Sequence, residues 1–289
     1  MPTKIEKDAI TGTDTTGHEW DGIKELDTPL PRWWVLTFYV TIVWAVGYWI
    51  LYPAWPTLHD YTRGILGYSV YDQLGQQMAE ASAKQAVYLD RIKGTTLQEI
   101  VADKELLDFA QAGGRTAFGD NCAPCHGAGG AGAKGYPNLN DDDWLWGGEL
   151  DTIYATVRHG IRADDPETRV SDMPRFGADG ILTPEQISDV AEYVLSLSGG
   201  SIDKEAVQRG APIFADNCAA CHGANGEGNH DLGAPRLNDN IWLYGGDKAT
   251  VVETITNARR GVMPTWASRL PDSTIKMLVV YVHSLGGGQ

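Results

Sequence analysis

A ten-residue stretch that occurs twice is the feature that most limits what this chain can fold into. FGDNCAPCHG spans residues 118–127, FADNCAACHG spans residues 214–223, and eight of the ten positions are identical. The four cysteines of the 289-residue chain all lie in these stretches: Cys122, Cys125, Cys218 and Cys221. None is left for a structural disulfide, so each copy has to bring two thiols and a histidine together.

The sequence around the two motifs also repeats, which divides this part of the chain into residues 109–200 and 201–289. Both units contain a glycine and a phenylalanine before the cysteines, then WLWGG or WLYGG, then Met-Pro, and finally EYVLSL or VYVHSL. Helical patterns begin and end each unit, glycine-rich loops lie between them, and no sustained strand alternation occurs. We therefore expect two mainly α-helical domains.

The pattern Cys-x-x-Cys-His is typical of covalent c-type haem attachment. Two thiols on one helical turn can reach two vinyl groups, and the next residue can bind iron. A thioredoxin-like redox site would need a βαβ context that is absent. A structural zinc site needs four ligands in one cluster, which the two cysteine pairs could in principle supply. Because each pair has its own histidine and loop, we predict two haem c groups, with His126 and His222 as proximal ligands.

Met173 and Met263 are the candidates for the sixth ligand of the irons. They lie 47 and 41 residues after the histidine of their own unit, and each precedes a proline, which favours an extended backbone. His/Met ligation fills both axial positions and favours electron transfer over substrate binding. The carbonyls of Pro137 and Pro235 are candidate acceptors for the other N–H of each proximal histidine. Met277, inside the last helical pattern, is expected to fill the core.

Three further histidines could compete for iron, but none has a counterpart in the other repeat. We expect surface or structural roles for these residues: His159, His230 and His283.

Residues 33–58 contain no charged side chain, and the predicted transmembrane helix covers residues 33–55. Tryptophan and tyrosine occur at both ends, as in the aromatic belts of membrane spans. A cleavable signal peptide would need a short basic leader and a shorter apolar run, whereas residues 1–32 are mostly acidic. Lys24 and Arg32 precede the span and only Arg63 follows closely, so residues 1–32 are expected in the cytoplasm.

Residues 56–108 are predicted to be a helical connector, in which Thr96 to Glu99 has the form of a capping box. The net charge of the chain is −15, and residues 109–200 carry 14 acidic and 6 basic side chains. This balance argues against nucleic-acid binding and is compatible with a basic protein partner.

The whole chain resembles one family. The segment TTGHEWDGIKELDTPLPRWW at residues 15–34, together with GAPRLNDNIWLYGG and the closing YVHSLGGG, is similar to the dihaem subunit of cbb3-type cytochrome c oxidases, called CcoP or FixP. The resemblance implies a mainly α fold with an N-terminal transmembrane helix and two tandem class I-like cytochrome c domains. It also implies that Cys122, Cys125, Cys218 and Cys221 bind the two haems covalently.

The resemblance further implies a place in an electron-transfer chain. Members of that family lie in the bacterial inner membrane with their haem domains in the periplasm. Their partners are a catalytic subunit with haem b, haem b3 and copper, a monohaem cytochrome c subunit, and cytochrome c electron donors. No independent active site is expected in this chain. The alternatives are a free-standing membrane-anchored carrier, a dihaem peroxidase and a haem-based gas sensor, of which the last two need an open iron site.

Overall fold

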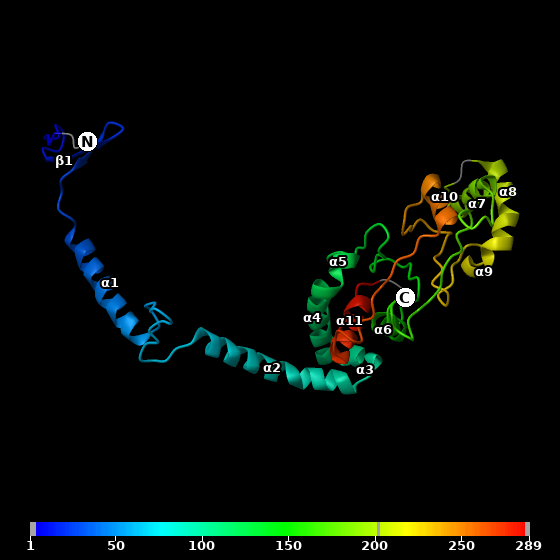
Figure 1. Ribbon diagram of the computed structural model, residues 1–289, viewed down its shortest axis with the longest axis horizontal. Helices are drawn as coiled ribbons and strands as arrows, with labels where there is room; N and C mark the ends of the chain where they lie inside the picture. Colours follow the sequence, from blue (N-terminus) through cyan, green and yellow to red (C-terminus); the bar gives the residue numbers. More distant parts are fainter. Residues whose placement is uncertain (1–3, 201–202, 287–289) are drawn as a thin grey trace. The chain divides into compact units, whose positions relative to one another are not determined.

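The computed structural model describes residues 4–200 and 203–286, and within these residues the chain is mainly helical, as expected (Figure 1). The elements in chain order are β1 (Thr15–Trp20), β2 (Ile23–Leu26), α1 (Arg32–Leu51), α2 (Val70–Gly94), α3 (Leu97–Ala102), α4 (Lys104–Asn121), α5 (Ala123–His126), α6 (Leu150–His159), α7 (Pro184–Leu197), α8 (Lys204–Asn217), α9 (Ala219–His222), α10 (Lys248–Asn257) and α11 (Asp272–His283). The chain divides into two units, Met1–Ser82 and Ala83–Gln289.

A two-stranded antiparallel hairpin, β1–β2, precedes the apolar helix in the first unit. Asp21 and Gly22 form its turn, and both have a positive φ, which matches the mirror-image turns that join twisted strands. This hairpin was not predicted, although Asp-Gly between two short β-prone runs is a recognised hairpin signal.

Helix α1 is long and apolar enough to cross a membrane. An 18-residue window of this 20-residue helix has a mean hydropathy of 1.7, and none of its side chains is buried. At about 1.5 Å per residue they span about 30 Å, the thickness of a hydrocarbon core. The helix ends at Leu51, and the chain then folds back so that the Ile65 and Leu66 amides donate to the Ile50 and Leu51 carbonyls at 2.9 and 3.1 Å. The final carbonyls of α1 are thereby satisfied within the chain.

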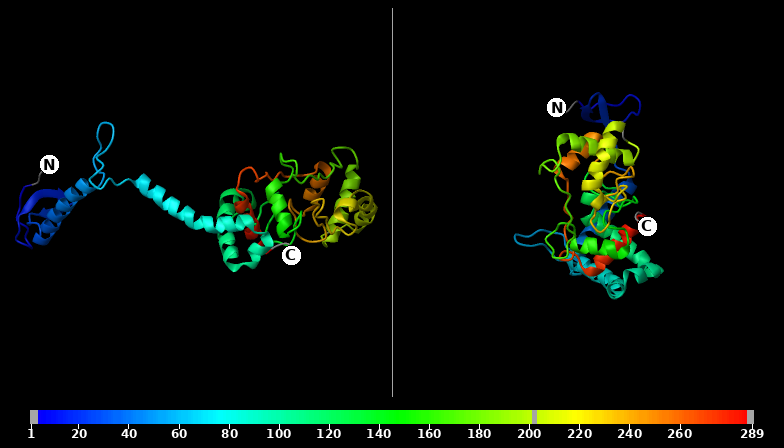
Figure 2. Two further views of the ribbon diagram at one scale, coloured as in Figure 1. Left: turned by 90° about the horizontal axis from the view of Figure 1, so that it is seen from below. Right: turned by 90° about the vertical axis from the view of Figure 1, so that its right-hand side faces the viewer.

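In the second unit, the C-terminal helices of the two sequence repeats have exchanged places. Helix α11, from the second repeat, packs against α4 and α6 of the first, and α7, from the first repeat, packs against α8 and α10 of the second (Figures 1 and 2). Only residues 198–203 separate α7 from α8, and a link this short favours packing of the two helices it joins. The first repeat must then take its closing helix from the end of the chain.

Each exchanged helix crosses its partner at a glycine. A Cβ on Gly114 of α4 would lie 2.7 Å from Tyr281 Cβ of α11, and one on Gly210 of α8 would lie 3.0 Å from Tyr193 Cβ of α7. The tyrosine rings pack on a phenylalanine one turn further on, with ring centroids 5.4 Å apart for Tyr281 and Phe118. The equivalent contact is Tyr193 with Phe214, at 5.0 Å.

Two separate cores result. The first core contains buried side chains of α2, α3, α4, α6 and α11, among them Ile92, Phe118, Ile153 and Leu278. The second core contains side chains of α7, α8 and α10 and of the segment before α7, among them Phe176, Val190, Phe214 and Ile255.

Aspartates cap the helices that lead to the cysteines, because Asp103 and Asp203 each accept two backbone N–H groups. The capping box predicted at Thr96 and Glu99 is confirmed at the start of α3.

We expect Gly114→Ala to lower the free energy of unfolding by about 1–3 kcal/mol, because the new methyl group overpacks the crossing with α11. Gly119→Ala, in the same helix, is the matched control: a Cβ there meets nothing within 4 Å. It should raise stability by up to about 1 kcal/mol through helix propensity alone. Chemical denaturation followed by helical circular dichroism measures both. Equal effects of the two substitutions would contradict a close crossing at Gly114.

Candidate functional site

Each Cys-x-x-Cys-His motif lies at the end of a long helix. Helix α4 ends at Asn121, Cys122 follows, and the single turn α5 brings Cys125 and His126 to the same end. The motif between α8 and α9 has the same geometry. No disulfide joins the cysteines, and Cys125 and Cys221 are exposed while Cys122 and Cys218 are half-buried.

The half-buried thiols are held in their neutral form. Burial raises the pKa of Cys122 and of Cys218 to about 11 in each case, and the neighbouring cysteine adds to the rise. Within residues 4–200 and 203–286, no three His, Cys, Asp or Glu side chains gather as a metal cluster. The structure therefore lends no support to the zinc alternative, in which both cysteine pairs would form one site.

Both motif histidines are oriented by a proline carbonyl, as predicted. His126 Nδ1 lies 3.1 Å from Pro137 O, and His222 Nδ1 lies 2.9 Å from Pro235 O. Burial lowers the pKa of each imidazole, an effect that the hydrogen bond partly opposes. With Nδ1–H donating to the carbonyl, Nε2 is the nitrogen that can bind a metal.

Each methionine lies against the same core as a cysteine of the other repeat. Met263 lies against the first core together with Cys122, and Met173 lies against the second core together with Cys218. We expected each methionine to serve the histidine of its own unit, but each one lies against the core that a cysteine of the other repeat contacts. The physical reason is the exchange of α7 and α11, since each methionine precedes its exchanged helix and travels with it.

The two methionine segments cross each other between the cores. Ile161 and Met263 form a backbone bridge, with Ile161 N to Met263 O at 2.9 Å and Met263 N to Ile161 O at 3.0 Å. Arg162 donates from Nε to Gly261 O at 2.7 Å, and Arg260 forms an ion pair with Asp172. These contacts hold the crossing segments together.

One buried polar atom indicates that the first site is built for a polar group the protein itself lacks. Trp144 Nε1 is inaccessible to water and has no hydrogen-bond partner in the described part of the chain. Trp144 packs on the first core, as Cys122 does. Leaving such a donor unpaired is costly, and a haem carboxylate is a suitable acceptor for it. The residues present therefore fit a haem.

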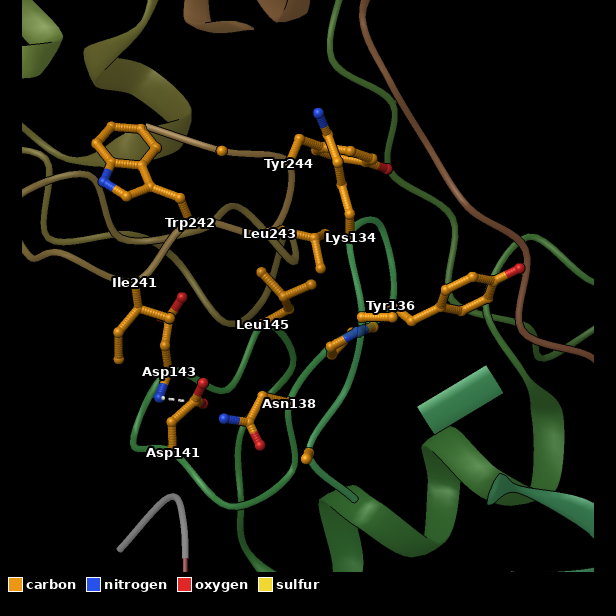
Figure 3. A pocket seen from close by; sticks show the side chains of 14 residues that line it. Lys134, Tyr136, Asn138, Asp141, Asp143, Leu145, Ile241, Trp242, Leu243 and Tyr244 are labelled. Carbon is orange, nitrogen blue, oxygen red and sulfur yellow. Dashed lines mark hydrogen bonds between the residues drawn. The ribbon is translucent and has the colours of Figure 1, made fainter. Parts of the chain in front are cut away.

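A cavity of about 460 Å³ lies where loops of the two repeats meet (Figure 3). Its walls come from residues 131–145 and 241–245. Asp141 and Asp143, on its rim, are half-buried, and only Asp142 of this acidic run is exposed. Burial, together with the nearby carboxylates of Asp239 and Asp141, raises the pKa of Asp143 to about 6.

Two arginines and two aromatic residues of this region were missed at the sequence level. Arg169 lies over the Trp146 ring and Arg259 over the Tyr244 ring, with guanidinium-to-centroid distances of 5.2 and 4.7 Å. A signal was available, because each arginine lies four residues before the methionine of its repeat. Among the remaining histidines, His159 is held by Asp165 at 3.0 Å, which fits a structural role.

Three family models match consecutive parts of the chain. Residues 12–59 match the N-terminal domain of cytochrome oxidase-cbb3, FixP, and residues 111–198 match cytochrome c. Residues 205–282 match subunit III of cbb3-type cytochrome c oxidase.

Relatives of similar length carry matching names. The cbb3-type cytochrome c oxidase subunit CcoP of Azospirillum brasilense is 55% identical over 291 residues, which cover 98% of this chain and 99% of the relative. The subunit FixP of Bradyrhizobium sp. ORS 278 is 56% identical over 293 residues and all of both chains. FixP of Rhizobium meliloti is 52% identical over 98% of this chain and 97% of its own.

The raised pKa of Asp143 predicts a pH dependence of stability. A carboxyl group whose pKa is higher when folded binds its proton more tightly in the folded state, so the free energy of unfolding should fall as pH rises from about 4 to above 6. Asp143→Asn should flatten that part of the profile and stabilise the protein at neutral pH relative to wild type. Urea denaturation across this range measures the effect. Asp142→Asn is the exposed control, and an equal flattening by this control would contradict the assignment to Asp143.

Proposed function

Because the chain belongs to the CcoP/FixP family of cbb3-type cytochrome c oxidase subunits, we propose that it is the membrane-anchored electron-transfer subunit of such an oxidase. In this proposal it holds two haem c groups, one on Cys122 and Cys125 and the other on Cys218 and Cys221. In the same proposal, oxygen is reduced in the catalytic subunit of the oxidase.

One observation carries the proposal. In both repeats a Cys-x-x-Cys-His turn has its histidine hydrogen-bonded to a proline carbonyl, and a methionine packs on the same core. A haem c supplies an iron centre that can take and release one electron. The two thiols would fix its edge, the imidazole Nε2 would bind one side of the iron, and the methionine sulfur would bind the other.

The packing supports crossed axial ligands. Met263 shares the first core with Cys122, and Met173 shares the second core with Cys218. We therefore assign His126 and Met263 to one iron and His222 and Met173 to the other. With a histidine and a methionine held to each iron, neither iron would be open to oxygen or peroxide, which favours electron transfer over a peroxidase or sensor role.

The proposed electron path rests on membership of the CcoP/FixP family. The chain would accept electrons from a periplasmic or membrane-bound cytochrome c and deliver them toward the catalytic haem–copper subunit, with the monohaem cytochrome c subunit as a further partner. Helix α1 would anchor it in the bacterial inner membrane. Lys24 and Arg32 before the helix support a cytoplasmic N-terminus and periplasmic haem domains.

Purification of the tagged full chain from its native membranes in mild detergent tests the assignment to an oxidase. We expect haem b, copper and oxygen consumption driven by reduced cytochrome c to co-purify with the haem c. Recovery of haem c alone, with no oxygen consumption, would identify a free-standing carrier instead.

Double variants test the crossed ligands and do not require each measured potential to be assigned to one of the two haems beforehand. His126→Ala with Met263→Leu should disturb one haem and leave the other with its wild-type potential, because both substitutions affect the same iron. His126→Ala with Met173→Leu should disturb both. Redox titration followed by visible absorbance measures the outcome, with Met277→Leu as the buried-methionine control. The reverse pattern would establish ligation within each repeat.

A further inference from the structure

An aromatic side chain of each repeat contacts the loop that orients the histidine of the other repeat. The backbone at Gly233 approaches the Trp146 indole so closely that a Cβ there would overlap the ring, with Cδ2 only 2.9 Å away. In the reciprocal contact, a Cβ on Gly135 would lie 3.3 Å from Tyr244 Cε1. Trp146 and Tyr244 are equivalent residues of the two repeats, and so are Gly135 and Gly233.

Each ring is held in place by an arginine of its own repeat. Arg169, which lies over Trp146, donates from Nε to Thr156 Oγ1 of α6 at 2.9 Å. Arg259, which lies over Tyr244, donates from Nη2 to Thr250 O of α10 at 2.7 Å. The rings are thus fixed to the body of one repeat while they contact the loop of the other.

The contacted glycines lead directly to the histidine acceptors. Gly233 lies two residues before Pro235, whose carbonyl bonds His222 Nδ1, and Gly135 lies two residues before Pro137, whose carbonyl bonds His126 Nδ1. Gly135 is also tied to the other repeat by its backbone, since its N–H donates to Leu243 O at 2.8 Å. Figure 3 shows this meeting of loops, with Tyr136 on one side and Leu243 and Tyr244 on the other.

We propose that Trp146 and Tyr244 are positioning residues that act across the repeats: Trp146 holds the proline carbonyl that orients His222, and Tyr244 holds the one that orients His126. This inference rests on the proposed haem ligation by the two histidines. It goes beyond that ligation, because each site would then depend on the other repeat for the hydrogen bond between its histidine Nδ1–H and the proline carbonyl.

The expected consequence is a change in reduction potential at the distant site. A carbonyl that accepts Nδ1–H makes the imidazole a stronger donor to iron and stabilises the oxidised state. Loosening the loop weakens this bond and raises the potential of the haem bound by that histidine. The effect should be larger for Trp146, whose side chain is buried, than for Tyr244, which is half-buried.

The experiment uses the full chain with its haems attached. His126→Ala and His222→Ala each displace one wave of a redox titration, which assigns the two waves without reference to the methionines. Trp146→Leu should then move the His222 wave to higher potential and leave the His126 wave unchanged. Tyr244→Leu should do the converse, to a smaller extent. Trp146→Phe and Tyr244→Phe keep a planar ring, so their reduction potentials should lie closer to wild type than those of the two Leu variants.

The rival outcome is an effect within the same repeat. Trp146 is two residues from Trp144, whose buried Nε1 belongs to the first site. A shift of the His126 wave by Trp146→Leu, a shift of both waves or of neither, or a shift to lower potential would overturn the proposal.

Haem content, measured by pyridine haemochrome, distinguishes failure of the proposed function from failure of the cross-repeat positioning. A wild-type chain without covalent haem would refute the proposed function, whereas normal haem content with unmoved waves would refute only the cross-repeat positioning.

Discussion

The close crossing of two helices at a glycine is the contact on which the rest of the structure depends. Gly114 lets α4 approach α11, and Gly210 lets α8 approach α7, with a tyrosine packed on a phenylalanine beside each crossing. Each crossing lies within three turns of a Cys-x-x-Cys-His motif, on the helix that leads to it. The helix crossings therefore decide which core lies next to each pair of cysteines.

Because the partners in these crossings are exchanged, neither sequence repeat contains a whole core. The first core needs α11 from the end of the chain, and the second core needs α7 from the middle. Each methionine lies in the segment that leads to its exchanged helix, so the segments around Ile161 and Met263 must cross. They are joined there by paired backbone hydrogen bonds. Two sites that look independent in the sequence are consequently built from shared segments.

The exchange also accounts for the contacts between the loops. Two independent domains joined by a linker would have no reason to bury Trp146 against Gly233 or to bond Gly135 to Leu243. Once the crossing segments hold the cores together, these loops contact each other. An electron-transfer protein benefits from such rigidity, because small changes around its ligands alter the potential of the iron.

Much of the chemistry was determined by the sequence alone. The two motifs, the proline acceptors, the capping box at Thr96 and the apolar helix near the N-terminus all depend on residues close together in the chain, where local geometry leaves little choice. The β1–β2 hairpin was missed because its only strong signal is a two-residue turn.

Only the tertiary structure decided which core each methionine packs against. Both repeats carry the same glycine, phenylalanine and tyrosine at their helix crossings, so either closing helix fits either partner and the pattern is degenerate. The short link between α7 and α8 selects one arrangement. The burial of Trp144 Nε1 and the raised pKa of Asp143 likewise depend on segments far apart in the chain, which no local pattern encodes.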